Sequence, residues 1–153
     1  MNVDEINILL VEDNPKDVQL TLRALRQENL ANSIQVARDG EEALDFLFCR
    51  GPFAGRSFDH PPRLVLLDLK LPKVDGLEVL RAVKGDPKTQ PIPVVVLTAS
   101  REEKDLVESY RLGVNGYIQK PVEFDAFREV IKQLGLYWLV VNEPPPAIAF
   151  QAG

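Results

Sequence analysis

The stretch Leu64-Val65-Leu66-Leu67-Asp68 is a short apolar run that ends directly in a carboxylate. Three other apolar runs also end in charged or hydroxylated residues, within 8–13, 94–98 and 116–121. Strands of a parallel α/β sheet read as continuous apolar runs because helices cover both faces. Ligands of such sheets bind at the carboxyl ends of the strands. The runs therefore predict one sheet edge that carries acids, a hydroxyl and a lysine.

The composition is typical of one soluble domain. The chain has 153 residues, the usual size of a single domain. Its formal net charge of −5 argues against nucleic acid as a partner, since that binding needs clustered positive charge. No basic, apolar leader opens the sequence, and no apolar run approaches membrane-spanning length. Cys49 is the only cysteine and forms no internal disulfide, so we expect a cytoplasmic protein without a membrane partner.

The rest of the chain alternates apolar runs with amphipathic stretches, which predicts βα repeats and a parallel sheet. Asn14-Pro15, Asp39 with Glu42, and a capping box at 100–103 are expected helix starts. We expect strands near 6–11, 34–37, 64–68, 92–97 and 116–119, and helices near 15–28, 39–48, 75–85, 100–113 and 121–134.

Two segments stand outside this alternation. The glycine- and proline-rich loop 51–62 is longer than most connections, and long loops are often functional or mobile. It contains His60, which has no second metal-type ligand nearby in sequence and is expected to be structural or solvated. The segment 136–141 is unusually apolar, and the prolines at 144–146 are expected to end regular structure.

Three carboxylates, Glu12, Asp13 and Asp68, are expected to meet at the sheet edge. Close carboxylates repel one another unless a cation or protons compensate. An oxygen-rich site with open positions suits Mg²⁺, which often bridges to phosphate. The alternative is that acids after strands are only helix caps and surface charge; their register with Thr98 and Lys120 favours the metal site.

Asp68 is the candidate nucleophile, because a carboxylate at the end of a rigid strand can attack phosphorus and form an acyl phosphate. Lys120 would neutralise a phosphoryl oxygen, and Thr98 would donate a hydrogen bond. Taken alone, Thr98 is better read as a β-forming residue and Lys120 as a solvated charge. A cis bond between Lys120 and Pro121 would aim the lysine at the site.

These residues resemble the receiver domain of bacterial two-component response regulators. The resemblance runs from Ile6 to Leu134 and rests on the order and spacing of four motifs. It implies a flavodoxin-like, three-layer (βα)5 fold with a central parallel five-stranded sheet in the order 2-1-3-4-5. The motifs are Val11-Glu12-Asp13-Asn14, Leu67-Asp68-Leu69-Lys70-Leu71-Pro72-Lys73-Val74-Asp75-Gly76, Leu97-Thr98-Ala99 and Tyr117-Ile118-Gln119-Lys120-Pro121.

The resemblance also implies roles. Asp68 would be the phosphoacceptor for a partner histidine kinase, and the backbone carbonyl of Lys70 would join Glu12, Asp13 and Asp68 around Mg²⁺. Thr98 and Tyr117 would form the switch pair, with Thr98 moving toward the phosphoryl group and Tyr117 turning inward. By itself, Tyr117 is better read as an edge-strand aromatic. Lys70 and Ser100 occupy positions that influence the access of hydrolytic water in the family.

The loop 51–62 and the tail are similar to those of small response regulators paired with cyanobacterial phytochromes. This similarity implies a phytochrome-type sensor kinase as the partner. We expect one receiver domain over 1–141, including a C-terminal extension of the last helix, followed by a flexible proline-rich tail over 142–153.

Two surfaces are candidates for binding partners. On the first helix, Lys16, Asp17, Leu20 and Ala24 are predicted to face away from the core. Receivers dock kinase helices on this face, although a single exposed leucine is ordinary. In the tail, Tyr137, Trp138 and Val141 are predicted to pair with a second subunit, and the alternative is that they fold back over their own sheet.

The leading interpretation is a stand-alone signalling receiver, active through an unidentified downstream protein or as a phosphorelay intermediate, and not an enzyme beyond its own phosphorylation and dephosphorylation. An aspartate-nucleophile phosphatase shares this topology but usually carries a second acid where this chain has Lys70. A flavodoxin-like cofactor binder needs a phosphate-cradling loop after the first strand, where Glu12-Asp13 would repel phosphate.

Overall fold

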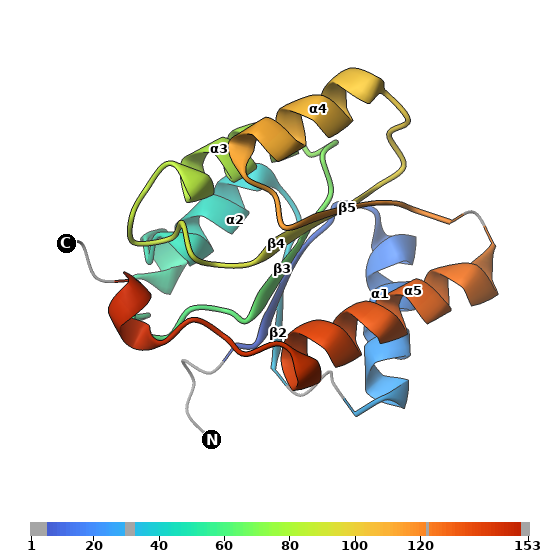
Figure 1. The fold of residues 1–153 in the computed structure, drawn as a ribbon, viewed down its shortest axis with the longest axis horizontal. Helices are drawn as coiled ribbons and strands as arrows, with labels where there is room; N and C mark the ends of the chain where they lie inside the picture. Colours follow the sequence, from blue (N-terminus) through green and yellow to red (C-terminus); the bar gives the residue numbers. More distant parts are fainter. Residues whose placement is uncertain (1–5, 30–32, 122, 151–153) are drawn as a thin grey trace.

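In the computed structural model, which describes residues 6–29, 33–121 and 123–150, the described strands form one parallel sheet in the order β2-β1-β3-β4-β5. Figure 1 shows helices on both sides of this sheet. This confirms the predicted flavodoxin-like fold. The strands are β1 (Ile8–Val11), β2 (Ile34–Ala37), β3 (Leu64–Leu67), β4 (Val94–Thr98) and β5 (Gly116–Gln119), and the helices are α1 (Pro15–Gln27), α2 (Gly40–Leu47), α3 (Gly76–Lys84), α4 (Glu103–Leu112) and α5 (Phe124–Leu136).

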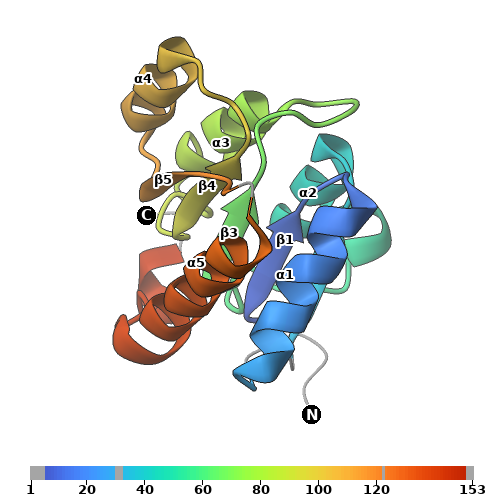
Figure 2. The ribbon, with the colours of Figure 1, turned by 90° about the vertical axis from the view of Figure 1, so that its right-hand side faces the viewer.

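Helices cover both faces of the sheet. On one face α1 and α5 lie side by side (Figure 2), and their apolar residues pack with Ile8, Leu10 and Leu66. On the other face, residues of α2 and α3 pack with Leu9 and Leu67. Side chains of a strand alternate between faces, so β1 and β3 supply both cores. This double burial explains the continuous apolar runs in the sequence.

The helix starts follow the predicted caps in two of three cases. The Asn14 side chain accepts a hydrogen bond from the Lys16 amide at 2.9 Å, and that of Asp39 accepts one from the Glu42 amide at 2.8 Å. The capping box at 100–103 is wrong, because α4 begins at Glu103 and its cap residue, Glu102, makes no side-chain capping bond. The Ser100 hydroxyl instead donates to Asp105 within α4.

The loop 51–62 is held down by Arg56. Its guanidinium lies over the Phe46 ring, 3.7 Å from the ring centre. It also donates hydrogen bonds to the carbonyl oxygens of Phe46 and His60. The His60 side chain is exposed, and Cys49 is half-buried.

The described part of the tail, 142–150, contains regular structure, although the sequence predicts none after the prolines; the flexibility of the tail stays a prediction. After α5, residues Tyr137–Val141 form a π-helical turn, and the Arg63 guanidinium donates to the Leu139 carbonyl at 3.0 Å. Residues Ala147–Phe150 form a 3-10 turn, and Phe150 is only 2% exposed. Phe150 joins the core on the α2 and α3 face. Burial of this aromatic ring offsets the conformational freedom lost in ordering the tail.

Candidate functional site

The carboxyl ends of four strands meet at one edge of the sheet, as predicted. Glu12 directly follows β1, Asp68 follows β3, Thr98 ends β4, and Lys120 follows β5. The register pairs Val11 with Leu67 and Thr98 with Gln119, which sets these ends level with their neighbours. Residues far apart in the chain therefore form one cluster.

The three predicted carboxylates lie together. Each of Glu12, Asp13 and Asp68 offers an oxygen, and these oxygens lie within 4.8 Å of one another. Glu12 is 3% exposed and Asp68 is 8% exposed, while Asp13 faces solvent. A set of hard oxygen donors with one open side suits a small divalent cation that keeps some of its waters. The geometry therefore fits the predicted metal site.

Lys120 lies among these acids. Its ammonium group donates to Glu12, to Asp17 at 2.8 Å and to Asp68 at 3.1 Å. Burial alone would lower the pKa of Lys120, but the hydrogen bonds to Asp17 and Glu12 and the nearby negative charges raise it above its usual range. Lys120 is thus a permanent cation beside Asp68. The described peptide bonds include no cis bond, so the expectation of a cis Lys120–Pro121 bond is wrong; the lysine reaches the site through a trans bond.

Burial also shifts the pKa of Glu12, and for this acid the shift is upward. It raises the pKa of Glu12 to about 7, with the charge of Asp68 acting in the same direction and the hydrogen bond and charge of Lys120 opposing. Desolvation disfavours a charged carboxylate, and a second carboxylate nearby adds repulsion. The site thus holds more negative charge than Lys120 alone offsets.

The backbone around Asp68 is tightly constrained. A Cβ atom at Gly76 would lie 2.3 Å from the Asp68 carbonyl oxygen, so only glycine allows α3 to begin so close to the acceptor. The Lys70 amide donates to the Asp68 carboxylate at 3.3 Å. The assignment of the Lys70 carbonyl as a metal ligand remains a prediction.

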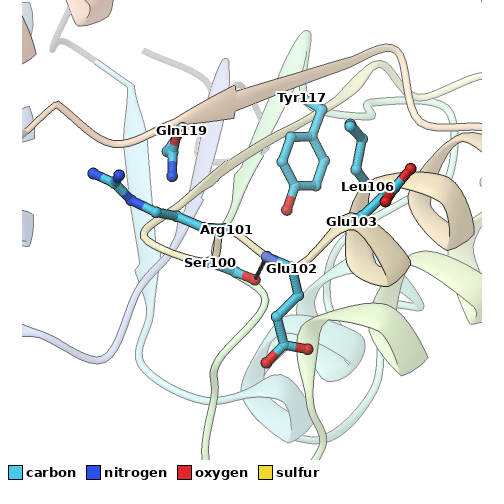
Figure 3. Close-up of a pocket in the computed structure, with 7 residues that line it drawn as sticks. All are labelled: Ser100, Arg101, Glu102, Glu103, Leu106, Tyr117 and Gln119. Carbon is cyan, nitrogen blue, oxygen red and sulfur yellow. Dashed lines mark hydrogen bonds between the residues drawn. The ribbon is translucent and has the colours of Figure 1, made fainter.

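The predicted switch pair, Thr98 and Tyr117, lies on the neighbouring strands β4 and β5. Thr98 is buried, and its side-chain oxygen accepts a hydrogen bond from the Ser100 amide at 3.2 Å. Tyr117 lines a pocket of about 380 Å³, and Figure 3 shows its hydroxyl directed toward the β4–α4 loop. The Ser100 side chain lies beside this hydroxyl and acts to lower its pKa. Burial and the charges of nearby carboxylates outweigh this effect, so the pKa of Tyr117 is raised above its usual value.

The predicted partner face on α1 is partly corrected. Lys16 is exposed and Leu20 is half-buried, and both line a groove of about 330 Å³ between α1 and the start of α5 that reaches Lys120. Ala24 is only 2% exposed, so its predicted place on this face is wrong: α5 packs against α1 and covers it. Asp17 also lines the groove, but its carboxylate binds Lys120.

Two contacts were not predicted from the sequence. The sequence predicts Asp17 on the partner face, whereas the structure places its carboxylate, in the first turn of α1, on Lys120 in the acid cluster. Asp105, which bonds to Ser100 and lies near Lys70, was not singled out. No motif signals Asp105, because its partners come from two other loops.

The parallel sheet and the acid cluster at its edge are those of a receiver domain, and the sequence comparison agrees. Residues 8–132 match the response regulator receiver domain, and the chain belongs to this family. Receiver domains of this family bind a divalent metal ion and are phosphorylated on an aspartate.

Two curated relatives are similar to this chain over most of their length. The chain is 43% identical over 142 residues to the probable methanogenesis regulatory protein FilR2 of Methanothrix harundinacea, covering 93% of this chain and 89% of FilR2. It is 38% identical over 140 residues to the response regulator Rcp1 of Synechocystis, covering 92% and 93%.

Two solved structures of response regulators also match most of this chain. The Mn²⁺-bound form of Rcp1 matches with a TM-score of 0.84 at 38% identity, covering 90% of this chain and 97% of that one. The phosphorylated cyanobacterial phytochrome response regulator RcpA matches with a TM-score of 0.84 at 41% identity, covering 90% and 96%. The chain is thus related to phytochrome-associated response regulators.

Proposed function

We propose that this protein is a single-domain response regulator that accepts a phosphoryl group on Asp68 from a histidine of a phytochrome-type sensor kinase. The observation that carries the proposal is the position of Asp68, which lies beside two further acids and 3.1 Å from the Lys120 ammonium. The similarity to Rcp1 and RcpA supports the choice of kinase. We place the reaction in the cytoplasm, as the composition of the chain suggests. As a separate finding, no helix among the described residues is both long and apolar enough to cross a membrane.

The transfer needs one bond to form and one to break. An oxygen of the Asp68 carboxylate attacks phosphorus, and the P–N bond to the kinase histidine breaks with its electron pair left on the imidazole nitrogen. Lys120, already a cation 3.1 Å from Asp68, neutralises a phosphoryl oxygen. Mg²⁺ held by Glu12, Asp13 and Asp68, with the Lys70 carbonyl as a further ligand, would supply charge neutralisation on the same group.

Phosphotransfer profiling tests this function. Candidate histidine kinases, phytochromes among them, are labelled with phosphate and mixed with the protein in Mg²⁺ and, separately, in excess chelator. We expect rapid transfer from a phytochrome-type kinase, and none once the metal is removed. Transfer that is equal with and without metal would contradict the role of the acid cluster.

The groove between α1 and α5 is the proposed kinase-docking surface, and Leu20 tests it. Leu20→Asp places a charge in an apolar part of the groove, so we expect the ratio of kinase-driven to phosphoramidate-driven labelling to fall roughly tenfold. Gln19→Asp is the matched control, since it adds the same charge to an exposed position of α1 outside the groove. An unchanged ratio in a folded Leu20→Asp variant would reject this surface.

After phosphorylation, Thr98 and Tyr117 would convert the chemistry into a changed surface. The position of Tyr117 supports this role, because its side chain lines a pocket together with residues of the β4–α4 loop, the loop that would move with Thr98. A downstream protein would then bind the changed surface. Alternatively, the protein is a phosphorelay intermediate and passes the phosphoryl group to another protein. The alternative of an aspartate-nucleophile phosphatase is disfavoured, because Lys70 occupies the position where such an enzyme carries its second acid. The ammonium group of Lys70 lies 3.6 Å from the Asp105 carboxylate.

We also propose a homodimer through the end of α5 and the turn that follows it. Tyr137 and Val141 are exposed there, and the patch continues through Leu136 and Val140. Trp138 is half-buried against its own core, so it supports the patch from behind and does not lie at its centre. An apolar patch of this kind is typical of an interface with a second copy.

Solution mass tests the dimer. We expect wild type to have the mass of a dimer by light scattering, and Val141→Asp to shift it to a monomer because a charge is buried without a partner. Val107→Asp is the control, since Val107 is an exposed apolar residue on α4. A monomeric wild type, both before and after phosphorylation, would count against the dimer.

A further inference from the structure

Asp105 is a buried acid that the phosphoryl-transfer chemistry does not use. It lies in the first turn of α4 and is only 4% exposed. The Ser100 hydroxyl donates to its carboxylate at 2.6 Å, and the Lys70 ammonium lies 3.6 Å from the same oxygen. Burying a carboxylate is costly unless it is paired and hydrogen-bonded, so these two contacts account for its burial.

The two partners of Asp105 come from two loops that border the phosphoryl site. Lys70 lies in the β3–α3 loop, and its amide donates to the Asp68 carboxylate at 3.3 Å. Ser100 lies in the β4–α4 loop, and its amide donates to the Thr98 side chain at 3.2 Å. One carboxylate on α4 therefore ties together the loop of the acceptor and the loop of the switch threonine.

We propose that Asp105 is a positioning residue that holds these two loops in the unphosphorylated arrangement; this inference rests on the proposed function. A Thr98 hydroxyl that turns toward a phosphoryl group on Asp68 must release the Ser100 amide. That release is opposed while the Ser100 side chain is fixed to Asp105. The same carboxylate draws the Lys70 ammonium away from the place a phosphoryl group would occupy.

Loss of the Asp105 carboxylate therefore favours the phosphorylated arrangement. In a two-state element, an interaction made in one state only shifts the equilibrium by its own free energy. We expect Asp105→Ala to gain phosphate from phosphoramidate faster, and to lose it more slowly, each by roughly threefold to tenfold. Asp105→Asn should lie between wild type and Asp105→Ala, since its amide oxygen still accepts from Ser100 but no longer attracts Lys70.

The direction of the change separates this role from a merely structural one. A damaged site would slow phosphate gain, whereas release of the loops speeds it. Ser100→Ala breaks the same contact from the other side without unpairing Asp105 from Lys70, and it serves if the Asp105 variants do not fold. Glu103→Gln is the matched control, because it removes an acid from the same turn of α4 and leaves Ser100 and Lys70 untouched.

The experiment measures the rates of phosphate gain and loss in these variants with Mg²⁺. It also measures amide exchange at Ser100 in the unphosphorylated protein. Faster gain, slower loss and faster Ser100 exchange in Asp105→Ala and Ser100→Ala, but not in Glu103→Gln, support the proposal. Wild-type rates and exchange in both variants overturn it. If wild type itself takes no phosphate, the proposed function fails, and the exchange result alone then supports or overturns the role of Asp105.

Discussion

Asp68→Asn is expected to abolish phosphate acceptance from both a histidine kinase and phosphoramidate. A carboxamide has the shape of the carboxylate but is not a nucleophile toward phosphorus. Asp68 is 8% exposed, and its backbone is fixed by the close approach of Gly76, so an asparagine would keep the position of the native side chain. Labelling followed by intact mass should fall to background in the variant.

The control for this variant is Asp125→Asn, which changes an exposed acid at the start of α5 in the same way. It should label like wild type. Because asparagine keeps the size of the Asp68 side chain and removes one of several crowded negative charges, the Asp68→Asn variant should remain folded by circular dichroism. Equal labelling of Asp68→Asn and wild type would remove the basis of the proposed function.

Lys120→Met is expected to have the second-largest effect, on both chemistry and stability. Removing one preorganised cation from a phosphoryl site should slow phosphate gain roughly a hundredfold or more. In metal-free protein, Glu12, Asp17 and Asp68 would lose the cation that they share. Removing one partner from a buried ion pair costs about 3–5 kcal/mol in the free energy of unfolding.

A divalent cation should restore much of that loss in stability. It binds only the folded cluster, and it binds there without competition from the ammonium group. Urea denaturation with and without Mg²⁺ should therefore show a larger metal-dependent stabilisation in Lys120→Met than in wild type. Lys104→Met, at an exposed lysine on α4, is the control. A metal effect in Lys120→Met no larger than in wild type would contradict the electrostatic account.

The sequence predicts those site residues that end a strand or directly follow one. Glu12, Asp68, Thr98 and Lys120 each stand at the end of an apolar run, and parallel pairing brings such ends to one edge. Asp17 and Asp105 stand on helices, and their positions follow from how the helices pack on the sheet. Asp17 lies 103 residues from Lys120 in the chain, so no local pattern marks their contact.

Helix packing also explains the error at Ala24. Periodicity within α1 identifies the stripe that faces the sheet, marked by Val18 and Leu25. It does not show that α5 packs against the flank of α1 and buries Ala24 as well. A helix that contacts both a sheet and a second helix has a wider buried surface than its own pattern predicts.

The structure of the tail also depends on long-range packing, which local sequence patterns do not predict. Its prolines predicted a segment without regular structure, and composition carries no information about a docking place for Phe150. That place exists because residues of α2, α3 and the sheet leave an apolar position that the ring fills. Long-range burial of one aromatic side chain thus overrode the local preference of the sequence.

The most direct test of the central claim is to locate the phosphoryl group. The protein is incubated with phosphoramidate and Mg²⁺, its intact mass is measured, and the acyl phosphate is reduced with borohydride before peptide mapping. The account predicts one metal-dependent adduct, found on Asp68 in the peptide that follows β3. An adduct on another residue, or no adduct in protein shown to bind Mg²⁺, would contradict it.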